Sequence, residues 1–167
     1  HEMSHGFDDQ GCQFDVTGNQ RNWWTAADKA AFDERCKLLV DCYSSMEVAP
    51  KLMPGVYCDG ERTLSENIAD LGGFNVLLDV YTDHLQQQGF RGEGLKAQQR
   101  KFFESSADRY RASLPDDGWE VFLDDVHAPY RERVNGVVRN NDLWYELYDV
   151  TPDNKLFLPA EKRVKIW

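Results

Sequence analysis

Residues 63–89 read TLSENIADLGGFNVLLDVYTDHLQQQG, with apolar side chains at helical spacing. Thr63 and Glu66 have the spacing of a capping box, in which each side chain bonds a free backbone N–H at a helix start. Gly89 suits the position just beyond a helix end, because glycine adopts a left-handed backbone without strain. We therefore expect a long helix here.

Further helices are expected on both sides of this stretch. Over residues 25–46, Thr25 is a suitable N-cap and apolar residues recur at helical spacing. Residues 49–62 hold two prolines and two glycines and predict an irregular crossing, with short strands near Val56 and Tyr57. The remaining expectations are a helix tail at 1–7, a loop at 8–22, a turn at 92–94, and helices at 95–114, 119–126 and 140–148, with breaks at Pro115 and Pro129. Because strand signals are few, the sequence predicts one mainly α domain over residues 1–167.

The composition excludes several classes of protein. Of 167 residues, 41% are hydrophobic and 13% aromatic, which is enough to build a core. Twenty-nine acidic against 19 basic residues give a net charge of −10, so the basic surface typical of nucleic-acid binding is missing. No apolar run reaches the roughly 18 residues of a membrane span. The chain has four cysteines, Cys12, Cys36, Cys42 and Cys58, and they form no CxxC pair. We expect mostly free thiols, and one or two disulfides remain an alternative.

The first five residues, His1-Glu2-Met3-Ser4-His5, form the pattern HExxH. On a helix, residues four apart lie on one face, so the two imidazoles can bind one Zn²⁺. Zinc lowers the pKa of a bound water to about 7, and Glu2 is placed to take the proton. The alternative is a chance pair of surface histidines, although the chain holds only four histidines in all.

A catalytic zinc site needs a third protein ligand and one open position. Glu66 and Asp70 lie four residues apart in the expected central helix and so share a face. Glu66 can bind the metal while Asp70 accepts the outer N–H of a zinc-bound imidazole. Asp8 and Asp9, one turn beyond His5, are further candidates for that second task. The alternative is that Glu66 only caps the helix and that Asp70 is solvated.

Several segments occur in a fixed order along the chain: HEMSHGFDDQG at 1–11, NWW at 22–24, GERTLSENIADLGG at 60–73, DVHAPYRERVNG at 125–136 and a terminal Trp167. Together they resemble the carboxy-terminal part of the neprilysin and endothelin-converting-enzyme family of zinc metallopeptidases, with bacterial members the most similar. The resemblance covers essentially the whole chain. It implies a helical zincin-type catalytic lobe that hydrolyses short peptides on the amino side of hydrophobic residues.

The resemblance also implies a role for each of eight residues. These are His1, His5 and Glu66 as ligands of one zinc, Glu2 as general base, Asp8 and Asp70 as orienting carboxylates, His127 as the group that stabilises the oxyanion, and Arg133 as the group that holds a substrate carbonyl. Preorganised donors and the fixed fork of an arginine suit the last two tasks.

Without the resemblance, the residues of the fourth segment, at 125–136, allow other interpretations. His127 can be a structural turn residue before Pro129. Arg133 can be one surface arginine among several, like Arg131 and Arg139. His84 is expected to be a surface residue of its helix.

The chain departs from the family pattern in three ways. The catalytic helix starts at HExxH itself, the substrate-clamping Asn-Ala-aromatic segment and the roof domain lie upstream in the family, and the tail at 162–167 lacks the cysteine of vertebrate members. The expected partners are therefore peptide substrates and the missing upstream portion, in the same parent chain or a separate one. An extracytoplasmic location is also implied by the resemblance.

Two alternatives to the enzyme hypothesis remain at this stage. The chain can be an inert fragment, zinc-bound or apo, that acts only as a subunit or interaction module. A different HExxH enzyme with another class of substrate is the second alternative, against which the ENIAD and DVHxP segments argue.

Overall fold

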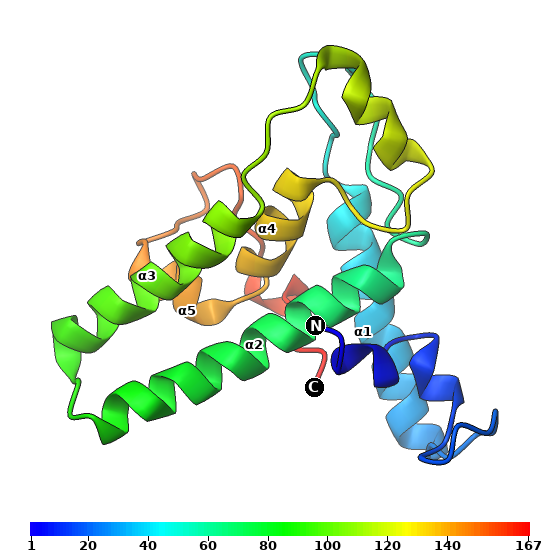
Figure 1. The fold of residues 1–167 in the computed structure, drawn as a ribbon, viewed down its shortest axis with the longest axis horizontal. Coiled ribbons are helices and arrows are strands. Elements are labelled where there is room, and N and C mark those ends of the chain that lie inside the picture. The colour runs from blue at the N-terminus through cyan, green and yellow to red at the C-terminus, as the bar shows by residue number, and fades with distance from the viewer.

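The computed structural model describes all 167 residues and is mainly helical, as predicted (Figure 1). Its five α-helices are α1 (Ala26–Ser44), α2 (Leu64–Gln87), α3 (Gly92–Arg109), α4 (Tyr130–Val138) and α5 (Asp142–Leu147). Four short 3₁₀ segments occur at Ser4–Gly6, Gly11–Gln13, Asp116–Leu123 and Ala160–Lys162. The long helix α2 runs through the middle of the molecule, and all the other α-helices except α5 pack against it.

The ends of α2 lie close to the predicted positions, but the predicted capping box is wrong. Gly89 follows the helix with φ +91°, as its role beyond the C-terminus requires. Thr63 makes no capping bond to the backbone; its hydroxyl donates to the Asp59 carbonyl at 2.8 Å and accepts from the Asn67 amide at 2.8 Å. Because Thr63 is turned inward, Glu66 is not held by the helix start and faces the N-terminal segment instead.

Helix α1 begins as predicted. The Thr25 side chain accepts a hydrogen bond from the Asp28 N–H at 3.1 Å, which satisfies one of the free donors at the helix start. Phe32, Cys36 and Leu39 face inward from α1 and are buried in the main core. This spacing is the helical periodicity read from the sequence.

Helix α3 and the segment after it differ from the prediction. Gly92 opens the helix instead of forming a turn, since the reversal of the chain is completed at Gly89. The helix ends at Arg109, five residues before the predicted end, where Tyr110 turns toward α2 and donates to Asp70 at 3.3 Å. The predicted helix at 119–126 is a 3₁₀ segment, Asp116–Leu123.

Helix α4 was not predicted, because Pro129 was interpreted as an interruption. Pro129 is instead the residue before the first helical turn, with φ −57°, a conformation that proline favours at a helix start. The helix predicted at 140–148 is shorter, Asp142–Leu147, because the Asn141 side chain caps it by accepting from Leu143 N–H and Trp144 N–H. The strands expected near residues 56–57 do not form; the structure has one isolated β-bridge there, between Glu47 and Tyr57.

The main core lies where α1, α2 and the C-terminal residues meet. It includes Leu39, Tyr43, Ile68 and Ile166, all at most 1% exposed. A second, smaller cluster joins α2, α3, α4 and α5: Leu78, Phe103, Val138 and Leu147. All four cysteines are buried and free, in agreement with the expected thiols. No helix is both long and apolar enough to cross a membrane.

Both chain termini lie against the middle of α2 (Figure 1). Two consecutive glycines allow this approach. A Cβ on Gly73 would lie 2.4 Å from the His1 nitrogen, and a Cβ on Gly72 would lie 2.4 Å from Nε1 of Trp167. The glycine pair therefore brings His1 within reach of the carboxylates on the same helix.

Candidate metal centre

The helix tail predicted at 1–7 is wrong, since the segment forms only a short 3₁₀ turn at Ser4–Gly6; this turn includes His5, and His1 lies before it. The N–H groups of Ser4 and Phe7 bond the carbonyls three residues earlier, His1 and Ser4, each at 2.9 Å. The two imidazoles nevertheless face the same side, with ring centroids 4.8 Å apart.

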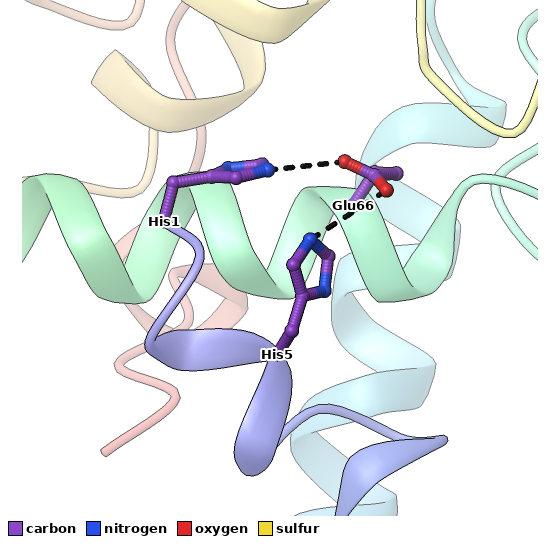
Figure 2. Close-up of side chains that lie close together, drawn as sticks. All are labelled: His1, His5 and Glu66. Carbon is purple, nitrogen blue, oxygen red and sulfur yellow. Dashed lines mark ion pairs between the residues drawn. The ribbon is translucent and has the colours of Figure 1, made fainter.

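Helix α2 supplies the third potential ligand. Figure 2 shows His1 and His5 pointing from the N-terminal segment toward the Glu66 carboxylate. His1 Nε2 lies 3.2 Å from Glu66 Oε2, and His5 Nε2 lies 3.6 Å from Glu66 Oε1. The potential ligand atoms of the three residues all lie within 4.8 Å of one another. Glu66 is 14% exposed, so water has little access to it.

The donor set fits zinc. Zinc–nitrogen and zinc–oxygen bonds of about 2.0–2.1 Å place the donors of a tetrahedral site about 3.3 Å apart, close to the spacings found here. Two imidazoles and one carboxylate are also a known set for catalytic zinc, which leaves one position for water or substrate. Glu66 Oε2 is buried beside imidazole nitrogens without a hydrogen bond of good geometry. A cation would satisfy this oxygen.

Asp8 orients His5. Its Oδ2 atom lies 2.7 Å from His5 Nδ1, and the carboxylate is 1% exposed. Burial would raise the pKa of Asp8, but hydrogen bonds from His5, Ser65, Gly11 and Gln10 together lower it below its ordinary value. The same bond to Asp8 raises the pKa of His5. Asp8 is therefore ionised and fixes the ring of His5.

Asp70 lies beside His1 and binds Arg133. Its Oδ1 atom lies 2.8 Å from His1 Nδ1, and its two oxygens accept from Arg133 Nε at 2.7 Å and Nη2 at 2.8 Å. Burial alone would lower the pKa of Arg133, but hydrogen bonding and the charge of Asp70 raise it. The Arg133 guanidinium also lies over the ring of Tyr110, 4.9 Å from its centroid. Asp70 is thus a shared anchor for His1 and Arg133.

His127 approaches the same Glu66 oxygen as His1 does. Its Nε2 atom is 3.1 Å from Glu66 Oε2, and its Nδ1 atom is 2.8 Å from Asp125 Oδ1. The backbone N–H of His127 donates to the same Asp125 oxygen, and both bonds lower the pKa of Asp125. Glu2 is exposed and forms no hydrogen bond or ion pair. Its charge is one of the causes that raise the pKa of His5.

The remaining candidates lie outside the centre. Asp9 accepts from the Gln10 side chain at 2.8 Å and does not contact either histidine of the motif. Arg131 pairs with Glu132, so Arg133 is the arginine that enters the site. His84 is exposed and contacts Gln88 at 3.0 Å, as expected for a surface residue.

Sequence reasoning missed three residues around the centre: Ser65, Tyr110 and Asp125. Asp125 lies two residues before His127, so the Asp-Val-His spacing offered a signal. Ser65 and Tyr110 had none, because their contacts join residues 57 and 40 positions apart.

A cavity of about 360 Å³ opens beside His1, Asp70 and Arg133. Its other walls come from α2, α3 and α4 and are largely apolar: Phe74, Leu77, Phe102, Phe103, Val134, Val137 and Val138. The candidate metal centre therefore borders an apolar pocket.

The helical fold and the HExxH–glutamate centre define the class of zincin-type metallopeptidase lobes. The sequence pattern of peptidase family M13 matches residues 1–164, and the chain belongs to this family. It is 32% identical to a neutral endopeptidase of Lactobacillus helveticus and 30% identical to human endothelin-converting enzyme 1, in both cases over the full chain. It spans 24% and 21% of those relatives.

Solved structures agree with this assignment. The Mycobacterium tuberculosis zinc metalloprotease Zmp1, in complex with an inhibitor, superimposes with a TM-score of 0.86 at 39% identity. PepO from Lactobacillus rhamnosis superimposes with a TM-score of 0.79 at 34% identity. All of this chain is covered in both cases, against 26% and 24% of those chains. The expected family and fold class are confirmed.

Proposed function

We propose that this chain is the zinc-bearing lobe of a neprilysin-like endopeptidase that hydrolyses short peptides. The observation that carries the proposal is the convergence of His1, His5 and Glu66, with ligand atoms within 4.8 Å of one another. These residues would hold one zinc ion. When bound, zinc acts as a Lewis acid that makes water acidic near neutral pH and polarises a carbonyl.

Glu2 would accept the proton of the attacking water. Its carboxylate forms no bond within the chain and is therefore free to act as a base. It directly follows His1 in the sequence, and this adjacency supports the assignment. A positioned general base contributes about 10²–10⁴-fold to a rate.

His127 would stabilise negative charge on the former carbonyl oxygen. Asp125 holds its Nδ1 at 2.8 Å and so directs Nε2 toward Glu66 and the metal centre. A preorganised donor of this kind contributes about 3 kcal/mol to transition-state stabilisation.

Arg133 would hold a backbone carbonyl of the substrate. Two of its nitrogens, Nε and Nη2, are bound to Asp70, which fixes the plane of the guanidinium. The Nη1 nitrogen makes no hydrogen bond within the chain and remains available to a ligand. Both N–H groups of Nη1 and the second N–H of Nη2 are therefore left for a ligand.

The apolar cavity supports cleavage beside a hydrophobic residue. It adjoins His1 and Arg133, so a peptide with its carbonyl at the metal centre can place a neighbouring side chain among Phe102, Phe103 and Val134. Filling the cavity by Val134→Phe should reduce kcat/KM for peptides with a large apolar side chain at that position, while peptides with alanine there are less affected. Equal losses for both peptides would argue against this pocket.

The activity of the whole protein would involve an upstream portion, since the curated relatives are about four times as long as this chain. We infer that residues 1–167 form one carboxy-terminal domain, that the upstream portion clamps the substrate and covers the site, and that the protein acts outside the cytoplasm. Fractionation of the source cells would test the location.

The first test is zinc stoichiometry after exhaustive dialysis, measured by elemental mass spectrometry. One zinc per chain is expected for a single site. Glu2→Gln should retain the zinc and abolish hydrolysis of a fluorogenic peptide. Full activity of Glu2→Gln would show that another group is the base.

The inert-fragment alternative is tested by size-exclusion chromatography combined with the same assay. An active monomer of 19.3 kDa would exclude it. If the chain binds zinc but does not hydrolyse the peptide, and adding the upstream portion restores hydrolysis, the result would support the inert-fragment alternative for the isolated chain.

A further inference from the structure

We infer that Ser65 is a positioning residue of the metal site, which acts through Asp8 to fix the orientation of His5. The inference deepens the proposed function and rests on it. Ser65 lies in the first turn of α2, directly before Glu66, and its hydroxyl donates a short hydrogen bond to Asp8 Oδ2.

The Asp8 carboxylate is held by four donors. Its Oδ1 atom accepts from the Gln10 N–H at 2.9 Å and the Gly11 N–H at 2.7 Å, while Oδ2 receives the Ser65 hydroxyl and faces His5 Nδ1 at 2.7 Å. Asp8 is 1% exposed, so water cannot readily replace a missing donor. Without the hydroxyl, the oxygen that holds His5 loses its link to α2.

The same bond connects the N-terminal segment to α2. Ser65 to Asp8 is the only hydrogen bond between residues 1–24 and that helix; the other polar links are the contacts of His1 and His5 with carboxylates of α2. Because Ser65 and Glu66 are neighbours, this bond couples the ligand from α2 to the ligand from the N-terminal turn. A loss of the bond should therefore weaken metal binding more than it weakens the fold.

The experiment measures the zinc Kd of the full chain by competition with a chelator, together with apo stability by urea unfolding. Ser65→Ala should raise the zinc Kd by about tenfold, the lower end of the range for residues that support metal ligands. Ser65→Thr keeps the hydroxyl and should restore the wild-type Kd. Ser45→Ala is the matched control, since the Ser45 hydroxyl bonds the Cys42 carbonyl at 2.7 Å in a different part of the fold.

A second comparison tests the route through Asp8. In an Asp8→Asn background, Ser65→Ala should cause no further loss of zinc affinity, because both changes break the same chain of contacts. Ser65→Cys keeps the side-chain size but donates only weakly, and it carries the test if Ser65→Ala does not fold. Visible spectra of the Co²⁺-substituted protein should also change in Ser65→Ala and not in Ser45→Ala.

The outcomes separate this inference from the proposed function. Failure of the wild-type chain to bind zinc would overturn the proposed site and this inference with it. Tight binding by the wild type with an unchanged Kd in Ser65→Ala would overturn the inference alone. An equal loss on the Asp8→Asn background would show that Ser65 does not act through Asp8.

Discussion

At the scale of single residues, Asp70 contacts more of the site than His1 alone. It faces His1, Arg133 and Tyr110 at once and is 5% exposed. Removing one partner of a buried ion pair lowers the free energy of unfolding by more than the pair contributes to it, because the remaining charge is buried without solvation. Asp70 therefore links metal binding to the stability of the fold.

Asp70→Asn should lower the free energy of unfolding of the apo chain by roughly 3 kcal/mol. It should also weaken zinc binding by about tenfold or more. Urea unfolding and chelator competition measure the two effects. Asp142→Asn is the control: Asp142 pairs with Arg163 at 2.9 Å but is 56% exposed, so a loss below about 1 kcal/mol is expected. Equal losses for the two variants would contradict the assigned role of Asp70.

Glu132, which lies outside the metal centre, should make the stability of the fold depend on pH. Burial raises the pKa of this carboxyl above its ordinary 4.5, although hydrogen bonding from Arg131 partly opposes the shift, and its Oε2 atom has no partner. Below the ordinary pKa both the folded and the unfolded chain hold the proton, so the group has no effect. Above it the unfolded chain releases the proton first, so stability falls as the pH rises through the folded pKa, and the loss persists at neutral pH.

Glu132→Gln should therefore be more stable than the wild type at neutral pH, with the difference vanishing toward about pH 4. Arg131, left without its partner, is 46% exposed and can be solvated. Urea unfolding across this pH range gives the comparison. A variant less stable than the wild type at neutral pH would show that the ion pair outweighs the burial of the charge.

The sequence brought together the potential ligands better than their surroundings. The proposed ligands His1, His5 and Glu66 follow from two spacings on local segments, and the structure places them side by side; Asp70 follows from the turn after Glu66. The contact of Arg133 with Asp70 spans 63 residues and depends on how α4 packs on α2, which no local spacing reports. The choice of Arg133 over Arg131 accordingly came from the family resemblance alone.

At the scale of elements, Gly73 explains why α2 accepts the N-terminal segment. A glycine in a helix interior normally costs about 1 kcal/mol relative to alanine. Here the missing Cβ leaves room for the backbone of His1, whose nitrogen and Cα would lie 2.4 Å and 3.0 Å from it. The helix gives up intrinsic stability at this point so that a ligand can approach.

Gly73→Ala should therefore displace His1 and weaken zinc binding about tenfold, although alanine favours the helix. Gly94→Ala in α3 is the matched control, because its Cβ would meet only Phe90 at 4.0 Å. That variant should gain up to about 1 kcal/mol in stability with an unchanged zinc Kd. If Gly73→Ala binds zinc as tightly as the wild type, His1 does not depend on this close approach.

Elements were predictable where local chemistry decides them. Thr25 and Gly89 mark helix ends through their own bonds and backbone angles, and both predictions are confirmed. Pro129 shows the opposite case, since a proline reads equally as a break or as the start of a helix. Helix α3 ends at Arg109, and the next residue, Tyr110, contacts Asp70 across 40 positions, which no local pattern indicates.

At the scale of the whole molecule, the metal centre joins a peripheral segment to a helix that belongs to the core. Ile68 and Leu71 of α2 are fully buried, and the C-terminal Ile166 packs in the same cluster. This core includes none of the three proposed zinc ligands, so the helical fold should form without metal. The N-terminal turn, by contrast, contacts α2 through the polar side chains of His1, His5 and Asp8 and through the backbone of His1 at Gly73.

Zinc should consequently stabilise the folded chain by linkage, with the largest local effect on residues 1–24. A free zinc concentration of 100 times the Kd should raise the free energy of unfolding by about 2.7 kcal/mol, because the unfolded chain leaves Glu66 far from both histidines. Thermal unfolding with and without zinc tests the global effect, and limited proteolysis should show selective protection of the N-terminal segment. His5→Ala should abolish both responses while the apo chain still unfolds cooperatively. If one zinc binds per chain but the unfolding midpoint does not move, the ion binds the unfolded chain equally well and the three ligands do not form a site that depends on this fold.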